Sequence, residues 1–181
     1  MADFTNQLTG FRPLLLVCAL VVGRVELTAQ PVQVAQAAAG PAATLTVTGA
    51  VHDSLALTID ALAKLPRMTV TVHEGGTDVK YDGVLLAELM KRAGAPSGAT
   101  LRGKALASYL LAEGQDAYRV VFALAECDPD FSDNPILVAD TRDGHPLVDP
   151  QGPFRLIAPR DKRPARSVRM LAKLTVVQLP D

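Results

Sequence analysis

The stretch that organises this sequence reads GPFRLIAPRDKRPARSVR and runs from Gly152 to Arg169. A Gly-Pro turn signal leads into a short apolar run, Phe154 to Ala158, which predicts a strand. Pro159 ends that strand, and the segment after it is more basic than any other part of the chain. Seven Lys or Arg and one acid, Asp161, fall between positions 155 and 173.

The cations of this segment are a candidate anion site. Two prolines stiffen the segment by fixing φ, so the charges are held in place. Guanidinium groups offer forked donors that suit phosphate or carboxylate. The alternative is a solvated surface loop whose charges pair with the acids upstream, since positions 113–149 hold nine acids and two bases. The candidate residues are Arg155, Arg160, Lys162, Arg163, Arg166 and Arg169.

Length and composition indicate one globular domain. The chain has 181 residues, of which 49% are hydrophobic, so a sizeable core is available. Its 18 basic and 19 acidic side chains nearly cancel, which argues against a nucleic-acid partner, because such a protein needs a net basic face. Trp is absent and other aromatic residues are few, so stacking on bases or sugars is not expected.

The amino-terminal region resembles a secretory signal peptide. Arg12 precedes an apolar run, Pro13 to Gly23, and an Ala-x-Ala site at residues 35–37 follows. Cleavage is expected after Ala37, with Ala29 as the second choice. This predicts a signal peptide over 1–37, a linker over 38–43 and a folded module over 44–181, periplasmic or secreted and without a membrane segment once cleaved. The alternative is a membrane anchor or an amphipathic tail.

Signal cleavage would leave Cys127 as the only cysteine. A single thiol forms no internal disulfide. Carboxylates on both sides, Glu126 and Asp128, raise the pKa of this thiol and reduce its reactivity. We therefore expect Cys127 to be a small buried hydrophobe and not a metal ligand.

Short β-branched runs alternate with turn signals along the module. Thr58 is the expected N-cap of a short helix that Pro66 ends, and residues 84–93 form the clearest helix, with Gly94 at its C′ position. The triplet Tyr81-Asp82-Gly83 predicts a turn. The pattern indicates an α+β fold, with a mixed, largely antiparallel sheet and a few short helices. Residues 113–116 (EGQD) predict the turn of a hairpin between 106–112 and 117–122. The expected strands are 44–51, 68–73, 106–112, 117–122, 136–141, 154–158 and 170–178.

The sequence contains no phosphate-binding glycine loop, paired Cys-x-x-Cys zinc site or His-Glu-x-x-His motif. His52, His73 and His145 are far apart in the chain. A pocket or metal site built from His73, Glu74 and His145 stays open as an alternative, although nothing in the spacing of these residues suggests shared ligation.

Five motifs in a fixed order carry a resemblance to a known family. They are YDGVLLAELM (81–90), GQDAY (114–118), LAECD (124–128), DGHPL (143–147) and GPFRLIAP (152–159). Together they resemble the molybdopterin-binding domain of sulfite-oxidase-type oxidoreductases, from about Thr44 to Leu179. The resemblance implies an α+β fold and makes molybdopterin the candidate cofactor.

The resemblance also implies which site residues to look for. In catalytic members, a cysteine on the segment that leads into the helix ligates molybdenum. The matching segment here, residues 69–76, has no cysteine; His73 or Glu74 falls near that place, and neither is a soft thiolate donor. The six cations of the basic segment match a region that lies near the cofactor phosphate and the anionic substrate in the family.

Two functions follow as hypotheses. The first is an exported binding module for a small anion, a pterin-like ligand or a partner protein, which does not itself catalyse redox chemistry. The second is a genuine molybdopterin-dependent oxidoreductase of the sulfite oxidase type, in which the metal is held without a protein thiolate. A structural or assembly partner whose basic segment docks on an acidic surface is a third alternative.

Overall fold

The structure is a computed structural model, and it describes residues 43–180. The predicted signal peptide, and all of the predicted linker except its last residue, lie outside the described residues and stay predictions. None of the described helices is both long and apolar enough to cross a bilayer.

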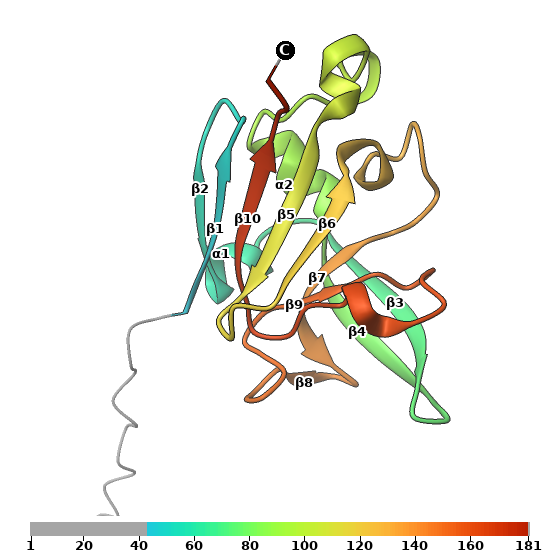
Figure 1. Cartoon of the computed structure of the whole chain (residues 1–181). Helices are drawn as coiled ribbons and strands as arrows, with labels where there is room; N and C mark the ends of the chain where they lie inside the picture. Colours follow the sequence, from blue (N-terminus) through green and yellow to red (C-terminus); the bar gives the residue numbers. More distant parts are fainter. Residues whose placement is uncertain (1–42, 181) are drawn as a thin grey trace, which may run out of the picture. The chain divides into compact units, whose positions relative to one another are not determined.

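The first sheet has five strands in the order β2-β1-β10-β5-β6 (Figure 1). Its first and last strands in the chain, β1 and β10, run parallel, and every other neighbouring pair is antiparallel. β5 and β6 form the hairpin that the sequence predicts. The strands are β1 (Thr44–Gly49), β2 (Leu55–Thr58), β5 (Tyr109–Gly114), β6 (Arg119–Ala123) and β10 (Leu171–Val177).

The second sheet is antiparallel throughout and has the order β3-β4-β7-β8, with β9 also paired to β7. β3 and β4 form a long hairpin that extends away from the first sheet in Figure 1. The strands are β3 (Arg67–Glu74), β4 (Thr77–Leu85), β7 (Leu137–Arg142), β8 (His145–Pro146) and β9 (Arg155–Ile157).

The helices are short. Thr58 is the N-cap of α1, as predicted, because its hydroxyl accepts a hydrogen bond from the Ala61 amide at 3.2 Å. α2 ends before Gly94, whose φ of +67° is the left-handed conformation of a C′ glycine. The α-helices are α1 (Ile59–Ala63) and α2 (Leu86–Arg92), and the 3-10 helices are η1 (Gly98–Thr100), η2 (Gly103–Ala107), η3 (Leu124–Cys127) and η4 (Pro164–Arg166).

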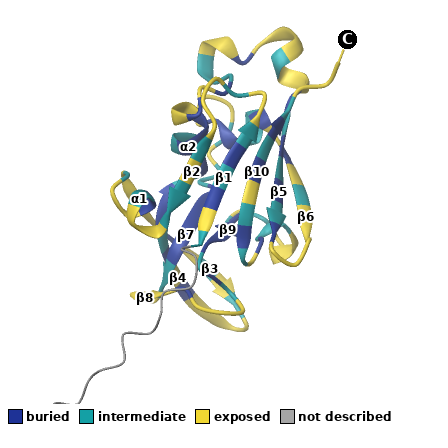
Figure 2. Ribbon diagram, turned by 90° about the vertical axis from the view of Figure 1, so that its left-hand side faces the viewer, coloured by how far each residue is buried: buried dark blue, intermediate teal, exposed yellow. Residues whose placement is uncertain are grey.

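The main core joins the inner face of the first sheet to α2 and to one face of the second sheet. Alternation in β5, where every second residue is buried, places Leu110 and Ala112 in this core. Leu89 of α2 and Val138 of β7 belong to the same cluster. Figure 2 shows buried residues along the strands of both sheets and exposed residues at the outer end of the β3–β4 hairpin.

The predicted fold class is confirmed, but the number of sheets and several local details differ from the prediction. The strands form two sheets and not one. Leu55–Thr58 is a strand, because it pairs with β1 immediately before the helix begins. Tyr81-Asp82-Gly83 is not a turn but the middle of β4, where the pairing with β7 shifts between Asp82 and Gly83. The predicted helix over 84–93 consequently starts at Leu86.

An ion pair ties β3 to β7 across the intervening β4. The Arg67 guanidinium donates to both oxygens of the Asp140 carboxylate, at 2.8 and 2.6 Å, and Thr141 donates to one of them at 2.7 Å. Burial alone would raise the pKa of Asp140, but these hydrogen bonds outweigh it and hold the pKa below its ordinary value.

This depressed pKa predicts a pH-dependent stability. A carboxyl whose folded pKa lies below its unfolded value stabilises the fold above the unfolded value, about 3.9, and loses that contribution as the pH falls through the folded value. The advantage of the native protein over an Asp140→Asn variant should therefore shrink as the pH falls from about 5 towards 2. Urea unfolding of both proteins across this range measures it; a difference independent of pH would contradict the prediction.

Candidate functional site

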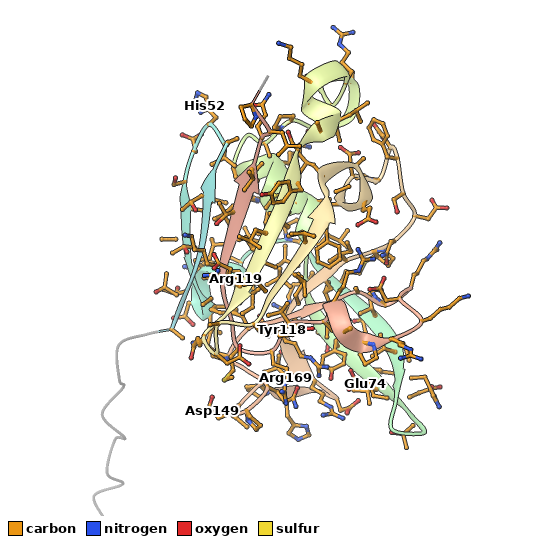
Figure 3. The ribbon with its side chains drawn as sticks, in the orientation of Figure 1. His52, Glu74, Tyr118, Arg119, Asp149 and Arg169 are labelled. Atoms are coloured by element: carbon orange, nitrogen blue, oxygen red, sulfur yellow. The ribbon has the colours of Figure 1, made fainter. Side chains whose placement is uncertain are left out.

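Two adjoining pockets lie where the β3–β4 hairpin meets the basic segment, residues 155–169, which begins with β9. The larger, ≈ 460 Å³, is lined by Gln151, Arg155 and Arg169 among others, and the smaller, ≈ 300 Å³, by Asp161 and Lys162. We call them together the basic pocket. Glu74 and Arg169, labelled in Figure 3, both line the larger part. The residues common to both parts are His73, Glu74, Pro164 and Ser167.

Local sequence explains how the walls of the basic pocket are held. Gly75 and Gly76 both have positive φ, which closes the β3–β4 turn directly after Glu74. On the other side, Pro164 occupies the start of η4. The Ser167 hydroxyl accepts a hydrogen bond from the Ala158 amide at 3.1 Å and so joins the two ends of the basic segment.

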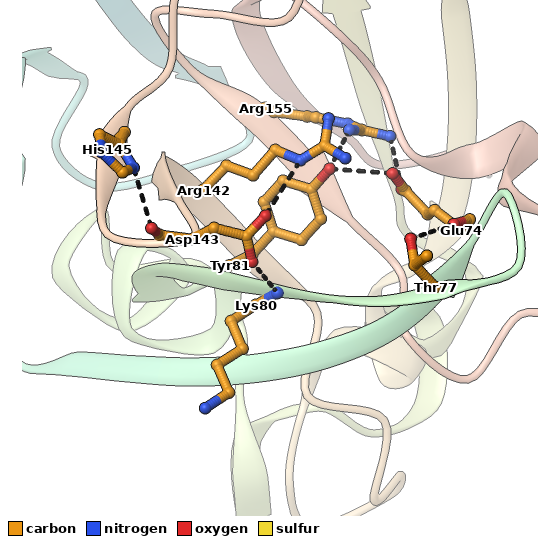
Figure 4. Close-up of polar contacts among 8 residues, drawn as sticks. All are labelled: Glu74, Thr77, Lys80, Tyr81, Arg142, Asp143, His145 and Arg155. Carbon is orange, nitrogen blue, oxygen red and sulfur yellow. Dashed lines mark hydrogen bonds and ion pairs between the residues drawn. The ribbon is translucent and has the colours of Figure 1, made fainter.

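Arg155 is buried in the wall of the pocket, with 6% of its surface exposed. It donates through one terminal nitrogen to Glu74 at 2.9 Å and through the other to the Tyr81 hydroxyl, and its guanidinium lies 5.0 Å from the centre of the Tyr81 ring. Tyr81 in turn donates to the other Glu74 oxygen at 3.0 Å (Figure 4). Burial raises the pKa of the Tyr81 phenol, with Glu74 acting in the same direction and Arg155 opposing it.

Two polar atoms at the larger pocket have no partner among the described residues. They are the Nε of Arg155 and the Oε1 of Gln151, both buried. The first is a donor and the second an acceptor. A buried polar group without a partner is costly, but these two atoms are themselves buried and do not open onto the pocket in this structure.

Arg166 is held by acids. Its guanidinium makes two bonds of 2.8 Å to Asp161 and one of 2.9 Å to Glu126, and it stacks 4.5 Å from the centre of the Phe122 ring. These bonds, those from Asp161 most of all, raise its pKa above the ordinary value for arginine. For this residue the structure favours pairing, with Glu126 upstream and with Asp161 inside the basic segment, over a free anion contact.

The remaining cations of the segment are exposed. Within residues 43–180, none of the four has an ion-pair partner. Lys162 and Arg169 line the basic pocket, whereas Arg160 and Arg163 line neither part of it. The structure thus divides the six predicted cations into Arg155 and Arg166, which carboxylates hold, and four without such a partner.

The three residues of the predicted alternative pocket are not brought together. His73 and Glu74 line the basic pocket, and the His73 ring bonds to Asp78 at 2.9 Å. His145 lies on β8 beside the backbone carbonyl of Asp143, at 2.9 Å, well away from Glu74 in Figure 4. Across the described residues, no group of three or more His, Cys, Asp and Glu side chains could hold a metal ion.

Cys127 lies in the main core, away from the basic pocket. It is 6% exposed, and burial, with Glu126 adding to it, raises the pKa of its thiol to about 12. Its Sγ contacts the Ala123 carbonyl at 3.7 Å. These observations agree with the expectation of a small buried hydrophobe.

The donor set of the basic pocket does not fit a molybdenum centre that a protein thiolate ligates. Near the position that the resemblance assigns to the ligand cysteine, the structure has the His73 imidazole and the Glu74 carboxylate. Glu74 is already engaged by Arg155 and Tyr81. Neither group is a soft donor, and the nearest thiol along the motifs, Cys127, faces a different part of the molecule.

Sequence reasoning missed two residues of this site. The turn signal predicts an exposed Tyr81, whereas the alternation of Val79 and Tyr81 on a paired strand places it inward. Gln151 carries no local signal, because its position depends on a distant contact, the hydrogen bond of 3.1 Å that its carbonyl accepts from the Met170 amide.

Comparison with known proteins agrees with this fold. No curated protein matches the chain. The crystal structure of the sulfane dehydrogenase SoxCD from Paracoccus pantotrophus is similar, with a TM-score of 0.59 and 22% identity over 74% of this chain; the match spans only 38% of the SoxCD chain. Residues 31–181 match the family described as the oxidoreductase molybdopterin binding domain. The chain therefore belongs to that family.

Proposed function

We propose that this chain is an exported binding module of its family, which holds a small anionic ligand in the basic pocket and does not itself catalyse redox chemistry. One observation carries the proposal. Among the side chains that line the pocket, each acid is already paired with a base, whereas Lys162 and Arg169 have no ion-pair partner in the described part of the chain.

Charge and hydrogen bonding both favour an anion in this pocket. Glu74 neutralises Arg155 and Asp161 neutralises Arg166, so the unpaired charge comes from Lys162 and Arg169. Both of these exposed side chains also carry hydrogen-bond donors. Phosphate, carboxylate and sulfate groups supply the matching charge and acceptors.

Binding of inorganic phosphate or sulfate to the full chain, followed by calorimetry, tests the proposal. Arg169→Ala should weaken binding by about 1.5–3 kcal/mol, as expected for a charge-assisted hydrogen bond. Arg160→Ala is the matched control, because this arginine is equally exposed but does not line the pocket. Equal losses in the two variants would mean that only the overall charge attracts the anion, and would refute the site.

The alternative function, a molybdopterin-dependent oxidoreductase, rests on membership of the family. Expression in a host that makes the cofactor, followed by metal and pterin analysis of the purified protein, separates the two. Stoichiometric molybdenum would overturn the non-catalytic proposal. A bound pterin without the metal would fit the binding module and would identify the ligand class.

A further inference from the structure

A second cavity, of ≈ 380 Å³, lies between α2, η1 and η3 and shares no residue with the basic pocket. Its volume is within the range of small-molecule sites, about 300–1,000 Å³. Apolar side chains, including Leu85, Met90, Leu124 and Cys127, form much of its wall. Such a wall favours the apolar part of a ligand.

A buried carboxylate gives this cavity its polarity. Asp128 is 6% exposed, and its two oxygens accept hydrogen bonds from the backbone amides of Gly98, at 2.7 Å, and Asp130, at 2.8 Å. No cation of residues 43–180 lies within ion-pair distance of it. A carboxylate oxygen can accept more than one bond, and a buried negative charge is stabilised by a positive partner.

The other charged residues at the cavity do not supply that partner. Asp130 is a further acid in the lining, and Glu88 is paired with Arg92 at 2.8 Å. Lys91, the single base in the lining, is exposed on α2 and makes no ion pair with Asp128.

A smaller cavity of ≈ 150 Å³ adjoins the first and shares Leu85, Ala87, Cys127 and Pro129 with it. Its lining includes Asn134, whose Oδ1 is buried and has no hydrogen-bond partner within the described residues. This oxygen is an acceptor, as is the Asp128 carboxylate. Each cavity thus has in its lining an acceptor with no cationic partner among the described residues.

We propose that this cavity binds a small primary amine with an apolar body, such as an arylalkylamine. Its ammonium group, with three donors and a positive charge, pairs with Asp128, and its hydrocarbon part packs against Met90 and Leu124. This site has the opposite charge preference from the basic pocket, and it stands whether or not the basic pocket binds an anion.

Methionine-methyl NMR of the full chain tests the proposal, because Met90 lines the cavity while Met68 and Met170 do not. Phenethylamine should shift the Met90 methyl resonance and leave the other two in place. 2-Phenylethanol and 3-phenylpropanoate have the same ring with a neutral and a negative head, and should bind at least about tenfold more weakly. Equal binding of the three compounds, or shifts at Met68 and Met170 as large as that at Met90, would overturn the site.

Two variants extend the test. Asp128→Asn should remove the preference for the amine over the alcohol, but Asp128 also holds the backbone at Gly98 and Asp130. Ala87→Leu is therefore the second variant: it leaves those bonds in place and fills the cavity from α2, where Ala87 lines both cavities. It should abolish the Met90 shift. If Ala87→Leu folds and the shift persists, the amine does not occupy this cavity.

Discussion

Replacing Glu74 by alanine is expected to destabilise the protein by about 3–5 kcal/mol, because it leaves the buried Arg155 charge without its carboxylate. The Arg155 side chain is 7% exposed and that of Glu74 22%, so water replaces the lost partner poorly. Tyr81 also loses its acceptor. The free energy of unfolding in urea or guanidinium, compared with that of the native protein, measures the effect.

A matched control lies on the same hairpin. Asp78 pairs with His73 at 2.9 Å, but both side chains are largely exposed, so Asp78→Ala should change stability by no more than about 0.5 kcal/mol. The double variant Glu74→Ala with Arg155→Leu should recover much of the loss, because it removes the unpaired charge as well. If Glu74→Ala costs no more than Asp78→Ala, Arg155 is not held as the structure indicates.

Because Glu74 pairs with Arg155, the binding of an anion in the basic pocket would depend on other cations. With both terminal nitrogens of Arg155 engaged, this residue contributes to the pocket through the shape of the wall. The net positive charge comes from exposed side chains on the basic segment. Affinity for a simple anion should consequently fall as ionic strength rises, since exposed charges are screened.

Sequence predicted the features that local signals control. The β5–β6 hairpin, the Thr58 N-cap and the Gly94 C′ position each depend on a few neighbouring residues, and each is confirmed. The basic segment also stood out as a candidate site. What sequence could not give is which of its arginines are already paired. Arg155 and Glu74 are 81 positions apart, and Arg166 and Glu126 are 40 apart, so these pairs exist only once the sheets have formed.

The turn predicted at Tyr81-Asp82-Gly83 is wrong for a reason that lies outside the local sequence. A tyrosine, an aspartate and a glycine in succession are typical of a turn, and the local pattern contains nothing against it. The structure instead places Gly83 inside β4, opposite Ala139 of β7. A glycine in a strand can mark a bulge or the close approach of another backbone, and here both apply.

Gly83→Ala is accordingly expected to destabilise the protein by about 3 kcal/mol or more, at the upper end of overpacking costs. A Cβ at this position would lie 2.1 Å from the Val138 carbonyl oxygen and 2.6 Å from the Ala139 Cα. These are backbone atoms of a paired strand, so relief requires β4 and β7 to separate. Unfolding by denaturant measures the loss.

The matched control is Gly75→Ala in the β3–β4 turn. Nothing lies within 4 Å of a Cβ built there, so its cost comes from the positive φ of +59° alone, about 1–2 kcal/mol. The larger loss at Gly83 would then be due to steric contact with β7 and not to backbone conformation. A Gly83→Ala variant as stable as Gly75→Ala would mean that β4 and β7 are not packed this closely, and that β4 does not hold Tyr81 against Arg155 as the structure indicates.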